Sequence, residues 1–183
     1  MRTFVALEIP REIVDVIGHG RRFLEQRLPP ARWVRPENLH LTLRFLGSIS
    51  RPTLEELVLE LERRLKGVGV PKVALGGSGV FRRARQAHVA WIGGEAEGME
   101  EVLLALDRGV EAVGLGRRNG RWNLHLTVAR SKKPWSSEAV GIFTEWGDAL
   151  ALPAFAAEEV LVMTSDLQPS GPVYTVFERI RLT

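Results

Sequence analysis

The chain has 183 residues, of which 45% are hydrophobic and 26% are charged, and its formal net charge is +3. These are the values of an ordinary globular protein with a real core, so they argue against disorder. The absence of cysteine excludes disulfides and thiolate metal sites. Nearly all of the 25 basic residues are arginine, which on composition alone favours a solvated surface but also suits phosphate or nucleic-acid ligands.

The first predicted element is a buried strand from Thr3 to Ile9, ended by Pro10. Its apolar run is too short for a signal peptide, and Glu8 interrupts it. No stretch of the sequence approaches the ~20 apolar residues that a membrane span needs. We therefore expect a cytoplasmic monomer that does not bind membranes.

Helices are predicted where apolar residues recur at intervals of three and four. The first covers residues 11–28 and ends at a Pro-Pro pair. The second is expected to begin at Thr53, which forms a capping box with Glu56, and to end at a glycine. The last two helices carry their apolar stripes over residues 99–113 and 137–148.

Further strands are predicted where β-branched and apolar residues run between turn residues. In chain order they are residues 39–46, 70–81, 86–92, 124–129, 158–163 and 173–181. A basic turn over residues 82–85 is expected to join two of them, and a turn-rich segment over residues 165–172 precedes the last. Several strands follow one another without a helix between them, which favours antiparallel pairing and an α+β fold.

One six-residue sequence occurs twice with a single difference: residues 38–43 read Asn-Leu-His-Leu-Thr-Leu and residues 123–128 read Asn-Leu-His-Leu-Thr-Val. In each copy His and Thr alternate with apolar residues, which is strand periodicity with the polar pair on one face. We expect two similar lobes that each contribute one copy to a shared groove; the alternative is that both copies lie on one side of a single sheet.

The residue types of the two copies suit proton transfer at phosphorus. Near neutral pH one imidazole of the pair His40 and His125 can be protonated while the other is neutral, which gives a general acid and a general base. The hydroxyls of Thr42 and Thr127 can donate hydrogen bonds to negative oxygens. A duplication with two merely structural histidines is the alternative, and the desolvation of two buried imidazoles argues against it.

Metal-dependent hydrolysis is the competing chemistry. Neither the HxxxH nor the HExxH spacing occurs, and neither copy contains a carboxylate, so the sequence predicts a reaction without a metal or other cofactor. The other histidines, His19 and His88, are interpreted as surface and structural residues. Two arginine clusters in predicted loops are either solvated or line the mouth of the groove; they are Arg82, Arg83 and Arg85, and Arg117, Arg118 and Arg121.

At the repeated motifs the chain resembles the 2H phosphoesterase superfamily, which is defined by two His-x-Thr/Ser-x motifs. Within it the chain is most similar to bacterial and archaeal RNA 2′,3′-cyclic phosphodiesterases, historically called 2′-5′ RNA ligases. The resemblance extends over essentially the whole chain. The segments that show the resemblance are the opening strand 1–6, the blocks 33–47 and 125–130, and the segment from Ser165 to Tyr174.

The resemblance implies that residues 1–183 form one domain of two intertwined, pseudo-symmetric lobes, each with an antiparallel sheet and outer helices around a central groove. It implies metal-independent hydrolysis of a 2′,3′-cyclic phosphate at an RNA end to a 2′-phosphate, and in some members reversible joining of 2′-5′ linkages. The partners would be such RNA ends or nucleotide cyclic phosphates.

The same resemblance implies the roles of the site residues. His40 would be the proton donor and His125 the proton acceptor, while Thr42 and Thr127 would bind phosphate oxygens. Phe45 would stack on the terminal base, and Arg130 would be a basic residue needed for activity. Strict alternation places Arg130 on the face opposite His125, so its role requires a β-bulge or a strand end near Ala129.

The sequence alone does not exclude two other functions. One is a non-catalytic protein that binds RNA ends or nucleotides through its arginine loops. The other is an enzyme with the same chemistry on a small cyclic nucleotide or a 2′-5′ oligonucleotide, because the loops that select a substrate are not decoded by a single sequence.

Overall fold

The computed structural model describes residues 1–83, 86–169 and 171–183, with the side chains of residues 83–87 left aside. Four α-helices lie at α1 (Arg11–Glu25), α2 (Arg51–Leu65), α3 (Met99–Ala112) and α4 (Ser137–Asp148), and a 3₁₀ turn covers Pro36–Asn38. The strands are β1 (Arg2–Glu8), β2 (Arg32–Trp33), β3 (His40–Ser48), β4 (Lys72–Arg83), β5 (Gln86–Glu97), β6 (Leu126–Trp135), β7 (Phe155–Ala156), β8 (Glu159–Gln168) and β9 (Gly171–Arg181). Within the described parts of the chain, no helix is both long and apolar enough to cross a membrane.

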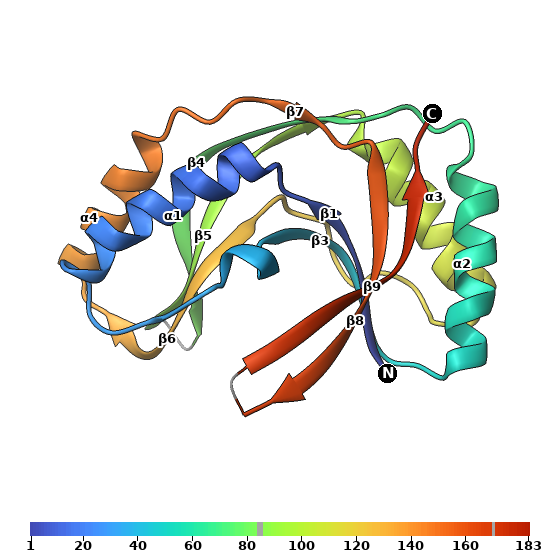
Figure 1. Cartoon of the computed structure of the whole chain (residues 1–183), viewed down its shortest axis with the longest axis horizontal. Coiled ribbons are helices and arrows are strands. Elements are labelled where there is room, and N and C mark those ends of the chain that lie inside the picture. Colours follow the sequence, from blue (N-terminus) through green and yellow to red (C-terminus); the bar gives the residue numbers. More distant parts are fainter. Residues whose placement is uncertain (84–85, 170) are drawn as a thin grey trace.

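The strands form two sheets. One has the order β3-β1-β8-β9 and the other the order β2-β6-β5-β4-β7, and every pairing between described strands is antiparallel. Helices α2 and α3 pack together beside the first sheet, while α1 and α4 cover the second (Figure 1). The predicted α+β fold of two lobes with antiparallel sheets and outer helices is therefore confirmed.

The chain does not complete one lobe before it starts the other. Strand β1 enters the first sheet, α1 and β2 belong to the second lobe, and β3 returns to pair with β1 (Figure 1). Near the end of the chain β8 closes the other side of β1, with Ala6 opposite Leu161. Each lobe is thus assembled from distant parts of the sequence, and the motif strands β3 and β6 come to lie where the lobes meet.

The core follows the predicted apolar stripes. Along α2 the leucines at positions 54, 57, 61 and 65 are fully buried, and along β1 the run from Phe4 to Leu7 is buried on both faces. Burial of each such side chain contributes roughly 1.5–3 kcal/mol. This rigid core fixes the strands on which the two motifs lie.

The structure corrects the predicted start of the second helix. Ser50, not Thr53, is the N-cap, because the Ser50 hydroxyl accepts a hydrogen bond from the Thr53 backbone N–H at 3.2 Å. Pro52 then occupies the first turn, where a missing N–H costs nothing. The prediction fails because a second capping residue type, Thr53, lies three residues downstream of the better cap.

The strand ends also differ from prediction. Strand β5 continues beyond Ile92 to Glu97. Arg82 and Arg83 belong to β4 rather than to a turn, while Ala84 and Arg85 lie outside the described residues. Most of the turn-rich segment 165–172 is strand, because β8 runs to Gln168 and β9 starts at Gly171; Ser170, between them, is likewise outside the described residues.

Candidate active site

The two motif copies have the same local structure. In both, the His and the Thr are half-buried, the residue between them is buried, and the two residues after the Thr are both buried. Two consecutive buried residues break the alternation of a regular strand. The pairing register shows why: Leu43 is skipped opposite β1, and Val128 is skipped opposite β5. Each copy therefore contains a β-bulge immediately after its Thr.

The bulges place two predicted site residues on the groove side. Past Leu43 and Arg44 the next side chain, Phe45, is 71% exposed, and past Val128 and Ala129 the next one, Arg130, is exposed. The irregularity that a role of Arg130 requires is therefore present. Phe45 and Arg130 occupy equivalent positions, five residues after His40 and His125.

Both imidazoles are held in the same way. The Nδ1 atom of His40 lies 2.7 Å from the carbonyl oxygen of Asn38, and Nδ1 of His125 lies 2.9 Å from the carbonyl oxygen of Asn123. A carbonyl only accepts, so each Nδ1 carries its proton and donates, which leaves Nε2 to exchange protons with a ligand.

Each histidine also contacts an aromatic ring from another strand. Tyr174 of β9 lies edge-on to His40 with ring centroids 5.2 Å apart, and Phe81 of β4 lies edge-on to His125 at 5.1 Å. The ring of Phe4 in β1 also lies beside His40, with ring centroids 4.9 Å apart. None of these three rings was predicted as a site residue, although Tyr174 closes the last segment of the resemblance.

Burial and neighbouring charges affect the protonation of His40. Burial lowers the pKa of His40, the Asn38 carbonyl opposes this effect, and the positive charges of Arg130 and His125 lower the pKa further. Arg130 and His125 thus act on His40 across the boundary between the lobes. In the free protein His40 is accordingly biased toward the neutral imidazole.

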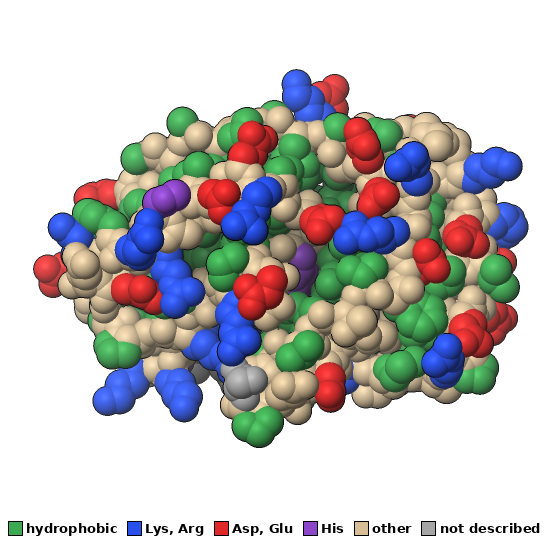
Figure 2. All heavy atoms as spheres, in the orientation of Figure 1, with side chains coloured by type: hydrophobic (Ala, Val, Ile, Leu, Met, Phe, Trp, Pro, Cys, Tyr) green, Lys and Arg blue, Asp and Glu red, His purple; other side chains and the backbone are tan. Residues whose placement is uncertain are grey.

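Two pockets flank the histidine pair. The Phe45 pocket, of about 430 Å³, is lined by Thr42, Leu43, Arg44, Phe45, Phe81, Leu115, Arg117, Arg118, Asn119, Arg121, Trp122, Asn123 and His125. The Arg130 pocket, of about 410 Å³, is lined by Arg21, Glu25, Ala31, Arg32, Trp33, Val34, Arg35, Asn38, Arg130, Gly171, Pro172 and Tyr174. Figure 2 shows a histidine at the floor of a hollow in the middle of one face of the molecule.

A third hollow shares the lining residue Phe81 with the Phe45 pocket and Arg130 with the Arg130 pocket. Arg82 and His88 also line it, and His88 Nδ1 lies 3.2 Å from the Ser131 carbonyl oxygen. His19 is exposed on α1 and lines none of these three hollows; its Nδ1 lies 2.7 Å from the carbonyl oxygen of Asp15. A larger hollow of about 570 Å³ is lined mainly by glutamates among its charged residues, which suits phosphate poorly.

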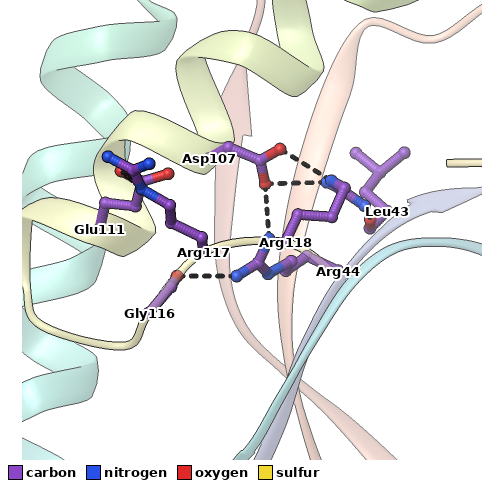
Figure 3. A network of polar contacts seen from close by, with 7 residues as sticks. All are labelled: Leu43, Arg44, Asp107, Glu111, Gly116, Arg117 and Arg118. Carbon is purple, nitrogen blue, oxygen red and sulfur yellow. Dashed lines mark hydrogen bonds and ion pairs between the residues drawn. The ribbon is translucent and has the colours of Figure 1, made fainter. Parts of the chain in front are cut away.

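The loop between α3 and β6 is tied to the bulged strand β3. Trp122 donates from Nε1 to the Thr42 carbonyl at 2.9 Å, and Arg118 donates to the Leu43 carbonyl at 2.8 Å. Asp107 of α3 binds Arg118 and the buried Arg44 at 2.7 and 3.0 Å (Figure 3). Because β3 is an edge strand, these side chains satisfy carbonyls that no neighbouring strand reaches.

Of the predicted arginine cluster in this loop, Arg118 therefore has a structural role as well as a place in the Phe45 pocket. Arg117 is largely exposed and lies 3.4 Å from Glu111. Arg121 is exposed at the pocket wall. Among the described residues no three His, Asp or Glu side chains gather closely enough to hold a metal ion.

Comparison with known proteins gives consistent matches. The model of the family described as LigT like Phosphoesterase matches residues 7–91, which include the first motif. The RNA 2′,3′-cyclic phosphodiesterase of Thermus thermophilus is 32% identical over 100% of this chain and 90% of its own length. The enzyme of the same name from Escherichia coli K12 is also 32% identical, over 100% and 97% of the two chains.

Solved structures agree over the full length. The crystal structure of TT0787 of Thermus thermophilus superposes with a TM-score of 0.77 at 26% identity, covering 100% of this chain and 98% of that one. Escherichia coli LigT complexed with 3′-AMP superposes with a TM-score of 0.75 at 25% identity and the same coverage. With relatives above 30% identity along its entire length, the chain belongs to the LigT-like phosphoesterase family.

Proposed function

We propose that the protein is an RNA 2′,3′-cyclic phosphodiesterase, which opens a terminal cyclic phosphate to a 2′-phosphate. The proposal rests on the two motif copies, which have the same local structure. In each copy the imidazole Nδ1 lies against a backbone carbonyl oxygen, and the charge of His125 affects His40 across the groove. The names of the full-length relatives support the same activity.

In this proposal His40 and His125 form the proton-transfer pair. Attack on phosphorus places the incoming and leaving oxygens opposite one another, so a donor and an acceptor are needed on two sides. The hydroxyls of Thr42 and Thr127 donate to the non-bridging oxygens, Phe45 stacks on the terminal base, and Arg130 offsets the phosphate charge. This chemistry requires no metal.

We assign His40 as the donor and His125 as the acceptor for ring opening. In the free protein the lowered pKa of His40 works against a donor role. A bound cyclic phosphate is an anion, and its charge opposes the effects of burial, Arg130 and His125 on that pKa. The assignment thus implies that His40 becomes protonated as substrate binds. In 2′-5′ joining a 5′-hydroxyl attacks in place of water and the two roles stay the same, whereas in the reverse cleavage of a 2′-5′ linkage they exchange.

The test is the incubation of RNA that ends in a 2′,3′-cyclic phosphate with the protein in EDTA. The wild type should release a 2′-phosphate end, while His40→Ala and His125→Ala should each lose ~10²–10⁴-fold or more in rate. His19→Ala, on the exposed face of α1, is the matched control and should retain full activity.

Activity that survives in both His40→Ala and His125→Ala would contradict the proposed proton-transfer mechanism. Activity of the wild type that disappears in EDTA and returns with a divalent cation would overturn metal independence. Salt-sensitive RNA binding without any turnover by the wild type would support the non-catalytic binder instead.

A further inference from the structure

The bulge of each motif copy is held by the segment that precedes the other copy. At the second copy, the carbonyl of Val128 accepts a hydrogen bond at 2.9 Å from the backbone N–H of Val34, which lies shortly before the first motif. At the first copy, two side chains from the loop before the second motif, Arg118 and Trp122, donate to carbonyls of the bulge. The two motifs are therefore fixed to one another in both directions.

The two connections differ in kind. Val34 directly follows the two-residue strand β2, which pairs with β6, so backbone hydrogen bonds hold the second copy. The first copy lies on β3 at the edge of its sheet, and loop side chains take the place that a neighbouring strand has at the second copy. Because a side-chain donor can be removed by a single substitution, the contribution of this connection to the reaction can be measured.

Trp122 links two groups that the proposed mechanism places on the phosphate. Its Nε1 donates to the Thr42 carbonyl at 2.9 Å, and the residue is bonded to Asn123, whose carbonyl accepts from His125 Nδ1 at 2.9 Å. Two hydrogen bonds and a short stretch of backbone therefore connect Thr42 of one copy to His125 of the other. Their spacing matters under the proposed function, because a misplacement of about 1 Å in a site of this kind can cost ~10²-fold in rate.

Arg118 holds the next peptide group of the bulge and is itself fixed at several points. Two of its nitrogens donate to Asp107 at 2.7 and 2.9 Å, a third donates to the Leu43 carbonyl, and its side chain is only 18% exposed (Figure 3). A bidentate pair with a carboxylate holds a guanidinium in one orientation. The two consecutive peptide groups that follow the Thr42 side chain are thus both held by donors with defined positions.

We propose that Trp122 and Arg118 are positioning residues for ring opening, which hold the Thr42 hydroxyl at a fixed place relative to His125. The inference rests on the proposed function and deepens it, because it gives the loop before the second motif a role in the chemistry of the first. Both side chains act through the backbone of β3, since their donors are engaged with its carbonyls. Their loss should therefore slow the chemical step more than it weakens substrate binding.

The experiment is a double-mutant cycle on the opening of a 2′,3′-cyclic phosphate at an RNA end. Trp122→Phe keeps an aromatic ring at the pocket wall but removes the donor to the Thr42 carbonyl. It should lower kcat about tenfold and change KM less than about twofold. In a Thr42→Ala background, which lacks the hydroxyl to be positioned, the same substitution should lower kcat less than about twofold.

A second loop variant and a control make the result specific. Arg118→Gln removes the donor to the Leu43 carbonyl and should show the same dependence on Thr42, so it decides the question if Trp122→Phe does not fold. Trp146→Phe is the matched control, because Trp146 packs on Phe143 in α4 and lines neither of the two pockets nor the third hollow. It should leave kcat unchanged, and thermal unfolding of each variant shows which of them are folded.

An equal factor for Trp122→Phe with and without the Thr42 hydroxyl would overturn the positioning role. An unchanged kcat of Trp122→Phe, or failure of both loop variants to fold, would overturn it as well, because the loop would then have no role in the reaction or a purely structural one. Absence of ring opening by the wild type would instead overturn the proposed function, so the two failures are distinguishable.

Discussion

At the scale of single residues, His40 and His125 have the same immediate neighbours in sequence, and His40 is also affected by charges from the other lobe. Both donate from Nδ1 to an asparagine carbonyl, yet burial and the charge of Arg130 lower the pKa of His40. The charge of Arg130 reaches His40 because the bulge at Val128 turns that side chain toward the groove. A backbone irregularity in one lobe thus adjusts the proton affinity of a side chain in the other.

The pH dependence of kcat/KM, which reports the free protein, should reveal this effect. A donor must be protonated, so activity that depends on His40 as donor is lost as the pH rises through its pKa, and that limb should lie below the ordinary value of 6.5. In Arg130→Gln the same limb should move to higher pH, because one of the charges that lower the pKa is removed. An unchanged profile in Arg130→Gln would contradict the effect of the Arg130 charge on His40.

The sequence predicts the residues on the motif strands better than those around them. Alternation alone places His and Thr together on one face, and the need for a bulge near Ala129 can be read from the position of Arg130. Tyr174 and Phe81 cannot be found in this way, because they reach the histidines from strands whose pairing partners are distant in sequence. The catalytic roles of the site residues stay proposals.

At the scale of secondary-structure elements, the bulged edge strand β3 depends on a loop that it does not pair with. The carbonyls of Thr42 and Leu43 accept hydrogen bonds from Trp122 and Arg118, and Asp107 holds the arginines in place (Figure 3). The same loop leads directly into His125. The network therefore connects the backbone of one motif to the approach of the other.

Substitution of Asp107 by alanine should weaken this connection. Arg44 is only 8% exposed and would lose its carboxylate partner, so the free energy of unfolding should fall by roughly 1–3 kcal/mol. Chemical denaturation monitored by tryptophan fluorescence measures the change. The control Glu111→Ala removes the partner of the exposed Arg117 and should cost less than about 0.5 kcal/mol; similar losses in both variants would contradict a specific role of Asp107.

The ends of the helices and strands show where the local sequence is enough to predict a boundary. Helix α4 occupies the predicted residues 137–148, and the Ser136 hydroxyl caps it by accepting a hydrogen bond from the Ala139 backbone N–H. The sequence predicts the start of α2 at Thr53 instead of Ser50, since both are plausible caps and only the backbone decides between them. Strands β8 and β9 exceed their predicted length because cross-strand pairing overrides the turn-forming residues within them.

At the scale of the whole molecule, a small net charge conceals a strong local one. The formal charge is only +3, but each of the two groove pockets is lined by four arginines, and only one glutamate accompanies them. Asp107, Glu111 and Glu25 pair with four of these eight arginines, and the others, which include Arg121 and Arg130, also lie along the groove. Long RNA should therefore be attracted along the groove by a field that composition alone does not predict.

This distribution predicts a difference in salt dependence between substrates. For an RNA of several nucleotides with a cyclic end, KM should rise steeply between about 50 and 200 mM salt. The slope of log KM against the logarithm of the salt concentration should be ~0.7 for each phosphate contacted. For a cyclic mononucleotide the slope should be close to that of a single contact. Steady-state kinetics at a series of KCl concentrations tests this, and equal slopes would show that the arginines do not contact the chain beyond its end.

The fold class could be predicted because neighbouring strands without intervening helices indicate antiparallel sheets. The order of the strands could not, because the pairing of β1 with β8 joins the two ends of the chain and leaves no local signal. Such pairings are decided by which apolar faces can be buried together. The monomeric state stays a prediction.

The position of β1 between β3 and β8 has a consequence during protein synthesis. Strand β3 follows β1 early, but Glu159, the first residue of β8, leaves the ribosome only after most of the chain. At ~5–20 residues per second, one edge of the apolar strand Phe4–Leu7 stays uncovered for on the order of 10 s. An open apolar edge pairs readily with other chains. The nascent polypeptide is therefore most prone to aggregation just before its last hairpin emerges.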